Sequence, residues 1–476
     1  MCKRKITIGA FALLAATQIA NADEPSSAGY QSFPSGYGYM QENEALAKAV
    51  KQGDHKVVRQ HGWKLWAGIM QPAQGLDWPV WYTWPNTKAA FADPGKSGLL
   101  GAEATELVSK PMIKHNQEHV APVNESKVPV YPIPEAVIKA YPNATSKCGK
   151  GNICDGSHVL FNGDIMIPTE SLSQEAMDWI RNSKQPLYKQ ATLNKVYEEK
   201  VHMLEAPQRH IVTKHMYWPV KATGLSAIPV WHDDFKNDYT GYAGYENWKN
   251  LVAVDPSGKQ VGTTQKVAYR YGVLLPGGTM PMEPAIAQAK VHGLDEFYYH
   301  KVTKADWDSF DEADKAIINA SSYWAYNQSF GPGDYLVTVA MHVNTKEIPS
   351  WALQSVWWTD QPDTAPYAAD RPKLPQAKGP WDHYLLVDSY GISEKPNGDQ
   401  PVAMNPYIEL VIHPVATNCN NCHVRAGWPT GNNAGQASYQ NPDCPQLLAT
   451  LTPDSMCLKK LTLTDFQWTI PDRAVK

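Results

Sequence analysis

Short apolar runs bounded by Gly, Pro, Asn and Asp recur along this 476-residue chain, and such runs are typical of strands. The clearest is Asp334 to Val343, which contains β-branched and aromatic residues and no turn residue after its first position. Shorter runs occur at Ile211 to Thr213 and at Val267 to Tyr271, whereas Pro362 to Pro380 carries five prolines and predicts an irregular crossing. The pattern favours a fold richer in strand than in helix.

Helical spacing of apolar residues is confined to fewer segments. Gln41 to Gln60 is polar, with Leu46, Val50 and Val57 on one side, and predicts a surface helix. A second helix is expected over Ser171 to Asn182, capped by Ser171 or Ser173. Two more are expected at Thr192 to His202 and at Lys304 to Asn319. Together with the strands, these segments predict the α+β class.

The first 22 residues have the pattern of a secretory signal peptide. Lys3, Arg4 and Lys5 precede a short apolar run, and Ala20-Asn21-Ala22 has the small-x-small form of a cleavage site. We expect residues 1–22 to be removed, giving a bacterial periplasmic or secreted protein that begins at or near Asp23 and has no membrane span. The alternative for the same residues is a single membrane anchor, although the run is short for one.

Charge and aromatic content narrow the partners. Without the three basic leader residues, 40 Lys and Arg face 47 Asp and Glu, a formal charge of −7, and no basic run appears. This balance argues against a nucleic-acid partner and is compatible with a basic redox protein as the partner.

The chain has 17 Trp and 24 Tyr but only 9 Phe. The clustered aromatic residues predict either ordinary core packing or an aromatic-lined pocket.

Cys419-Asn420-Asn421-Cys422-His423 carries the most specific chemistry in the sequence. Two thiols one helical turn apart can both reach the vinyl groups of one haem, and the adjacent histidine can ligate its iron. We therefore expect one covalent haem c held by Cys419, Cys422 and His423.

The chain resembles c-type cytochromes through this motif and its exported setting. It is similar to a group of exported mono-haem proteins that share a Trp-rich β region, a Thr-Lys-Glu-Ile-Pro-x-Trp stretch (Thr345 to Trp351) and an Asn-Pro-Tyr turn (Asn405 to Tyr407). The resemblance would cover most of the chain and implies no substrate. The distribution of predicted elements suggests a Trp- and Tyr-rich, β-rich mixed domain over residues 23–400, followed by a haem c-binding segment over residues 401–476. The segment departs from small cytochromes c, because Tyr407 to Ile412 predicts a strand before the motif and Pro414 opposes a helix.

Other readings of the two cysteines stay open. A Cys-x-x-Cys pair also occurs in thioredoxin-like redox sites and as half of a zinc site. A zinc site would need two further ligands, for which His413 and Cys444 are available.

The sixth position on the iron separates an electron carrier from a haem enzyme. The candidate ligands are Met456, Met404, His413, His342 and Met341. Because side chains alternate along a strand, Met341 and His342 should point to opposite faces. We expect residues before 400 to cover the distal side of the haem, with Met456 as the leading alternative.

The four other cysteines of the mature chain form two local pairs. In an oxidising compartment the simplest pairing is Cys148–Cys154 and Cys444–Cys457. The sequence as a whole thus predicts a periplasmic mono-haem cytochrome c acting in electron transfer or redox chemistry. The alternative is a haem-dependent oxidase, peroxidase or oxygenase acting on a small molecule, and the sequence leaves open whether the protein is an enzyme.

Overall fold

A computed structural model describes residues 29–76, 78–92, 131–132, 167–232, 248–269, 273–274, 285–310, 312–377, 379–391, 400–409, 416–431, 435–439, 441–445 and 448–476. This part contains helices and several sheets, with more strand than helix, as expected for an α+β, β-rich fold. The expected leader, the Cys148–Cys154 pair and His413 lie outside the described residues. No helix in the described ranges is long and apolar enough to cross a membrane.

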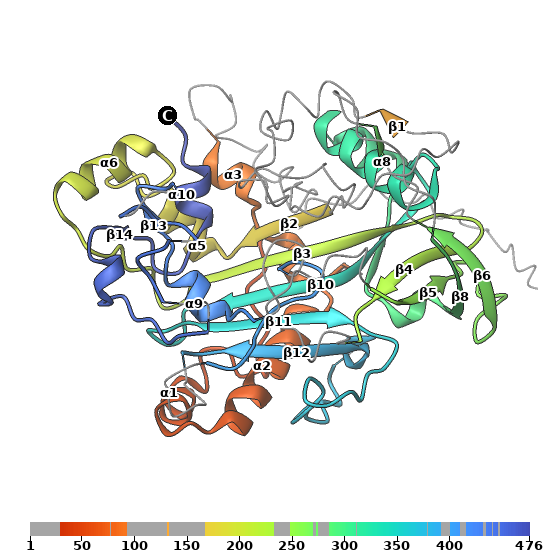
Figure 1. Cartoon of the computed structure of the whole chain (residues 1–476), viewed down its shortest axis with the longest axis horizontal. Coiled ribbons are helices and arrows are strands. Elements are labelled where there is room, and N and C mark those ends of the chain that lie inside the picture. The colour runs from red at the N-terminus through yellow and green to blue at the C-terminus, as the bar shows by residue number, and fades with distance from the viewer. Residues whose placement is uncertain are drawn as a thin grey trace, which may run out of the picture.

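The largest element is an antiparallel sheet in the order β12-β11-β10-β3-β2, with β9 beside the start of β10 (Figure 1). Its strands are β2 (Ile167–Leu172), β3 (Ile211–Val220), β9 (Tyr299–Lys301), β10 (Tyr335–Thr345), β11 (Ala352–Trp358) and β12 (Tyr384–Ser389). The strand predicted at 334–343 is β10, at the centre of the sheet. Its side chains are buried almost throughout, because both faces of the sheet are covered.

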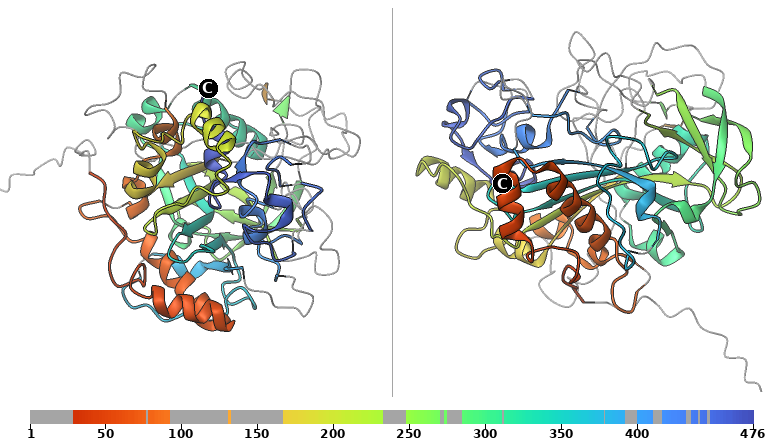
Figure 2. Two further views of the ribbon diagram at one scale, coloured as in Figure 1. Left: turned by 90° about the vertical axis from the view of Figure 1, so that its left-hand side faces the viewer. Right: turned by 90° about the horizontal axis from the view of Figure 1, so that it is seen from below.

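The two faces of this sheet have different covers. His342 pairs with Lys214 and Ser355, so these side chains share one face, whereas Met341 and its partner Val356 belong to the other. Helices α1 (Asn43–Gln52) and α2 (His55–Ile69) lie on the Met341 side, called here the helix face, because they pack against Ala352, Gln354 and Leu386. The described residues from 400 onward, called the tail, lie on the opposite side of the sheet (Figure 2), where Asn405 bonds to Ser355. This side, shared by His342, is called the tail face.

The tail is built from short elements. They are α9 (Cys419–His423), β13 (Gly427–Trp428), η7 (Met456–Leu458), β14 (Thr462–Leu463) and α10 (Thr469–Arg473). The apolar side chains of this segment pack with Leu353 and Val212 of the tail face. These short elements, with the Cys444–Cys457 disulfide inside the segment, pack against a sheet whose strands all come from earlier in the chain.

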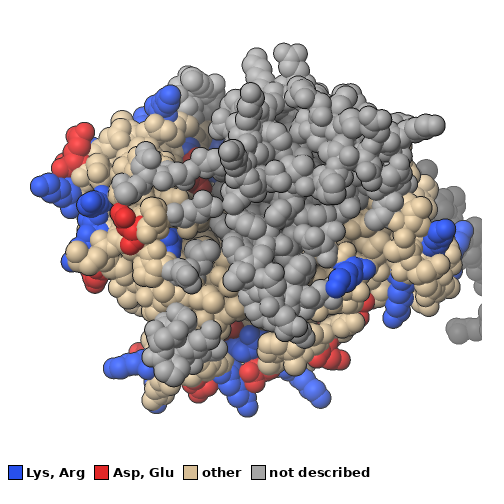
Figure 3. Space-filling model, in the orientation of Figure 1, with Lys and Arg blue, Asp and Glu red and all other residues tan. Residues whose placement is uncertain are grey.

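A second sheet has the order β4-β5-β8-β6. Its strands are β4 (Ser226–Val230), β5 (Asn250–Val254), β6 (Thr264–Tyr269) and β8 (Ala285–His292). Further described elements, besides the helices taken up below, are β1 (Tyr131–Pro132), β7 (Val273–Leu274), α3 (Thr87–Phe91), and the 3-10 turns η1 (Val80–Thr83), η5 (Leu294–Glu296) and η6 (Trp381–His383). On the face drawn in Figure 3, basic and acidic side chains are mixed along the left and lower margins.

The prediction of a single surface helix over 41–60 was wrong in two respects: the segment forms two helices, and the second is buried. Gly53 adopts the left-handed conformation that ends α1, and the Asp54 side chain accepts a hydrogen bond from Val57 N to start α2. Helix α2 then continues to Ile69 with Trp63 and Trp66 fully buried, so it is a core helix.

The other helix predictions fared differently. Helix α5 (Gln174–Ile180) is capped by Ser173, which accepts from Ala176 N, as expected. Helix α6 (Gln190–Glu198) lies within two residues of its predicted start. The single helix predicted at 304–319 is instead two helices, α7 (Lys304–Ser309) and α8 (Glu312–Tyr326).

The described aromatic clusters are mainly core. Trp81 of the Trp78–Trp84 cluster, and Trp357 and Trp358 of β11, are among the most deeply buried side chains of the described chain. Trp358 stacks on Phe297 with ring centroids 4.1 Å apart, and Trp81 stacks on His215 at 3.3 Å. For these residues, core packing accounts for the aromatic content that the sequence left ambiguous.

Candidate functional site

The cysteine motif forms a short helix that is fastened to the large sheet. Asn418 caps α9, because its side-chain oxygen accepts from Asn420 N at 2.9 Å and from Asn421 N at 3.4 Å. The same oxygen accepts from the Ser389 hydroxyl of β12 at 2.8 Å. Cys419 and Cys422 are both free thiols, one helical turn apart, as covalent attachment to one ring requires.

His423 is held in one orientation by a backbone carbonyl of the tail. Its Nδ1 lies 2.7 Å from the Phe466 carbonyl oxygen, and since a carbonyl only accepts, Nδ1 carries the proton. Burial lowers the pKa of His423 to about 4, against the opposing effect of this hydrogen bond, so the ring is neutral at pH 7. Its Nε2 has no hydrogen-bond partner among the described residues and keeps the lone pair that a metal needs.

The electrostatics of the two thiols argue against a thioredoxin-like site. Burial raises the pKa of Cys419 well above its usual value and that of Cys422 to about 12. A nucleophilic cysteine pair needs the opposite shift, toward the thiolate. The neutral thiol is the stable form of both residues in this structure.

The zinc hypothesis also loses one of its two candidate further ligands. Cys444 and Cys457 form a disulfide with a Cα–Cα distance of 5.2 Å, which confirms the predicted pairing and removes Cys444 as a metal ligand. Within the described ranges no group of three or more His, Cys, Asp and Glu side chains is arranged to hold a metal ion.

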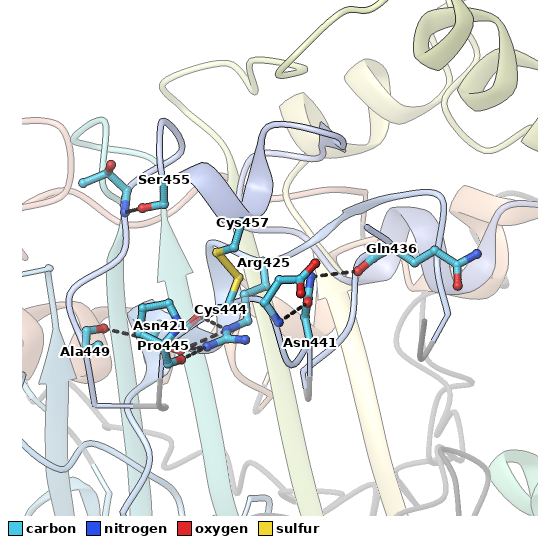
Figure 4. The surroundings of a disulfide bond; sticks show 11 residues. Asn421, Arg425, Gln436, Asn441, Cys444, Pro445, Ala449, Ser455 and Cys457 are labelled. Carbon is cyan, nitrogen blue, oxygen red and sulfur yellow. Dashed lines mark hydrogen bonds between the residues drawn. A yellow bond between two sulfur atoms is a disulfide. The ribbon is translucent and has the colours of Figure 1, made fainter. Parts of the chain in front are cut away.

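Arg425 joins the motif helix to the disulfide loop (Figure 4). It is 2% exposed and donates to Asn421 Oδ1 at 2.9 and 3.0 Å, and to the Pro445 carbonyl at 2.7 Å. Burial lowers its pKa, and the hydrogen-bonded oxygens replace the water that the guanidinium has lost. This contact was missed at the sequence level, because nothing in the motif marks an arginine two residues after the histidine as buried.

Polar side chains of the tail face gather beside the motif. His342 Nε2 lies 3.0 Å from Glu409 Oε1, and the charges of both residues act on His423. Burial by itself would raise the pKa of Glu409, but the effects of His342 and the Asn405 backbone outweigh it and lower that pKa. An ionised carboxylate and a histidine therefore stand near the proposed axial ligand.

The Asn-Pro-Tyr turn places Glu409 there. Asn405 donates from its side chain to Ser355 Oγ at 2.8 Å and to the Val356 carbonyl at 2.9 Å, and its backbone N–H donates to Glu409 Oε2. The strand predicted over 407–412 was wrong for the described part, because 407–409 belong to this turn. The sequence marked the turn but not the carboxylate that it carries.

The candidates for the sixth ligand are dispersed. Met341 lies on the helix face of β10, separated from α9 by the sheet, and Met404 is 1% exposed in the main core. Met456 is 76% exposed beside the disulfide, and His413 is outside the described residues. Met404 and Met456 belong to the tail itself, and the residue before Met404, Ala403, accepts from Cys419 N at 3.1 Å. Of the four described candidates, His342 is the one that stands on the tail face of the large sheet and acts electrostatically on His423.

No protein-family model, no curated protein and no solved structure matches this chain. The similarity to exported mono-haem proteins therefore stays a prediction from the residues.

Proposed function

We propose that the protein is an exported mono-haem c-type cytochrome that acts in electron transfer or redox chemistry. Cys419 and Cys422 would hold one haem through thioethers, and His423 Nε2 would ligate its iron. The observation that carries the proposal is the arrangement of α9: two free thiols one turn apart, followed by a neutral histidine whose Nδ1 is already bound.

The group, when bound, would supply one-electron chemistry, and the residues of the chain supply its setting. Asn418 and Ser389 fix α9 on the large sheet, while Phe466 fixes the ring plane of His423. The raised pKa values of the two cysteines are consistent with thiols that end as neutral thioethers rather than as reactive thiolates.

A haem enzyme acting on a small molecule is the second candidate, and the His342–Glu409 pair favours it. His342 Nε2 and Glu409 Oε1 lie 3.0 Å apart, and histidine and glutamate are residue types that serve as general acids and bases in enzymes. If His342 instead ligates the iron, the site has two strong axial ligands and the carrier function is favoured. The periplasmic or secreted location and a protein or small-molecule redox partner belong to both forms of the proposal.

The test is to purify the protein from bacteria that can mature cytochromes c. We expect the mass of a chain beginning at or near Asp23 plus one haem, and a haem c absorption spectrum after acid-acetone extraction. His423→Ala should keep some haem attached but lose normal axial ligation. His202→Ala is the matched control, because His202 also contacts a backbone carbonyl (Pro453, 2.9 Å) without adjoining the motif.

The outcomes separate the candidates. An apoprotein mass would refute the haem proposal, and an unchanged spectrum in His423→Ala would assign the iron to another residue. High-spin iron that binds cyanide or carbon monoxide would favour the enzyme, and a low-spin spectrum that resists both would favour the carrier.

A further inference from the structure

The Thr345 to Trp351 stretch, which begins at the last residue of β10, contacts the tail through two of its side chains. Lys346 Nζ lies 2.8 Å from Asp465 Oδ1, and Trp351 Nε1 donates to the same oxygen at 3.0 Å. The second oxygen of Asp465 accepts from Ala206 N at 2.8 Å. The Asp465 side chain is fully buried, so three donors from the large domain hold one desolvated carboxylate.

Asp465 belongs to a turn that is hydrogen-bonded to the motif helix α9 and to the residues that follow it. Within this 464–468 turn, the Phe466 carbonyl accepts from His423 Nδ1, Thr464 N donates to the Ala426 carbonyl at 2.9 Å, and Trp468 Nε1 donates to the Cys422 carbonyl at 3.1 Å. The turn thus contacts the second cysteine, the histidine and the residues that follow them.

The backbone of the turn needs an external constraint. Asp465 and Phe466 have φ values of 49° and 65° in succession. Asp adopts this left-handed conformation more readily than most residues, whereas a bulky residue such as Phe seldom does. Such a conformation persists where the surroundings determine it. The three donors on Asp465 are the contacts that hold the first of these residues in place.

We propose that Lys346, Trp351 and Asp465 are positioning residues for His423: they hold the 464–468 turn so that the Phe466 carbonyl keeps its hydrogen bond to Nδ1. The inference rests on the proposed function, because the property that would change is the reduction potential of a bound haem iron. A carbonyl that accepts from Nδ1–H makes the imidazole a stronger electron donor to iron and stabilises the oxidised state. Loosening the turn should therefore raise the reduction potential.

The primary variant is Lys346→Met, which removes the cation from Asp465 and keeps the length of the side chain. We expect unchanged haem content, a more positive midpoint potential in a redox titration, and altered g-values in the electron paramagnetic resonance of the oxidised protein. Lys346→Arg retains the cation and should restore both values. Trp351→Phe removes one hydrogen-bond donor to Asp465. It should shift the midpoint potential and the g-values in the same direction as Lys346→Met, but by less. It replaces Lys346→Met as the test variant if that protein does not accumulate.

Lys221→Met is the matched control. Lys221 also pairs with a buried aspartate, Asp334, but it follows the end of β3 that lies beside β4, away from α9 (Figure 1). The Lys221→Met variant should be less stable than the unmutated protein, but its midpoint potential and g-values should be unchanged. An unchanged potential in Lys346→Met, or an equal shift in Lys221→Met, would overturn the inference.

Failure of the proposed function is distinguishable from failure of this inference. If the unmutated protein carries no haem, the function fails, and nuclear magnetic resonance of the ¹⁵N-histidine-labelled protein still reads the tautomer of His423. The Nδ1-protonated form in the unmutated protein, with its signal changed in Lys346→Met and kept in Lys221→Met, supports the positioning role. Identical His423 signals in all three proteins would refute it.

Discussion

His61 lies between two carboxylates at the junction of α2 with the end of β10. It is 1% exposed; its Nε2 is 3.0 Å from Glu347 Oε2 and its Nδ1 is 3.2 Å from Glu42 Oε2. Glu347 is itself buried and also accepts from Thr345 Oγ1 at 2.6 Å and from Met40 N at 3.0 Å. Burial by itself would lower the pKa of His61, but its hydrogen bonds with Glu347 and Glu42 outweigh this effect and raise the pKa to about 9.

This shift makes stability depend on pH in the alkaline range. A rise from 6.5 to about 9 corresponds to about 3 kcal/mol of unfolding free energy. Because the folded-state pKa is the higher one, the contribution is fully present below pH 6.5 and is lost as pH rises through 9. His61→Gln should be less stable at pH 6 by about 3 kcal/mol or more, since Glu347 stays buried without a cation. The difference from the unmutated protein should shrink toward pH 9.5.

The assay is urea unfolding followed by far-ultraviolet circular dichroism at several pH values between 6 and 9.5. The unmutated protein should lose stability across this range, and His61→Gln should show a flatter profile. His300→Gln is the control, because it removes a less buried histidine that lies 3.1 Å from Asp306, and it should retain the slope of the unmutated protein. Equal slopes for His61→Gln and the unmutated protein would refute the reasoning.

Three further outcomes are expected. His342→Ala should change the oxidised spectrum, whereas Met456→Ala should not, because Met456 is 76% exposed; loss of a near-infrared sulfur-to-iron band in Met456→Ala would reverse this order. Replacing Cys444 and Cys457 together by Ser should lower the unfolding free energy by about 2–3 kcal/mol, measured by urea unfolding, since their bridge closes a short loop. Arg425→Lys should cost about 1–3 kcal/mol in the same assay, because an ammonium cannot reproduce the guanidinium contacts to both Asn421 and Pro445; equal stability would contradict this.

Features that depend on neighbouring residues were predictable from the sequence. Three such features involve only residues that are close in the chain: the helix of the cysteine motif, the Ser173 cap and the Cys444–Cys457 disulfide. The central strand β10 was also predicted, because its long apolar run has no competing turn signal. The break at Gly53 and Asp54 was equally local, but the helical spacing on either side concealed it.

The surroundings of the motif were decided by tertiary structure. The carbonyl that orients His423 belongs to Phe466, 43 residues later, and Lys346 reaches Asp465 across 119 residues. No periodicity encodes such pairs, because they arise only when the tail packs on the sheet.

Alternation along β10 predicted that Met341 and His342 would diverge, but it did not say which of them faces the motif. That choice follows from α2 covering one face of the sheet and the tail covering the other. The sequence alone therefore determined the chemistry offered by Cys419, Cys422 and His423. The packing of distant segments determined which carboxylate, imidazole and carbonyl stand beside them, since burial and long-range hydrogen bonds exist only in the folded chain.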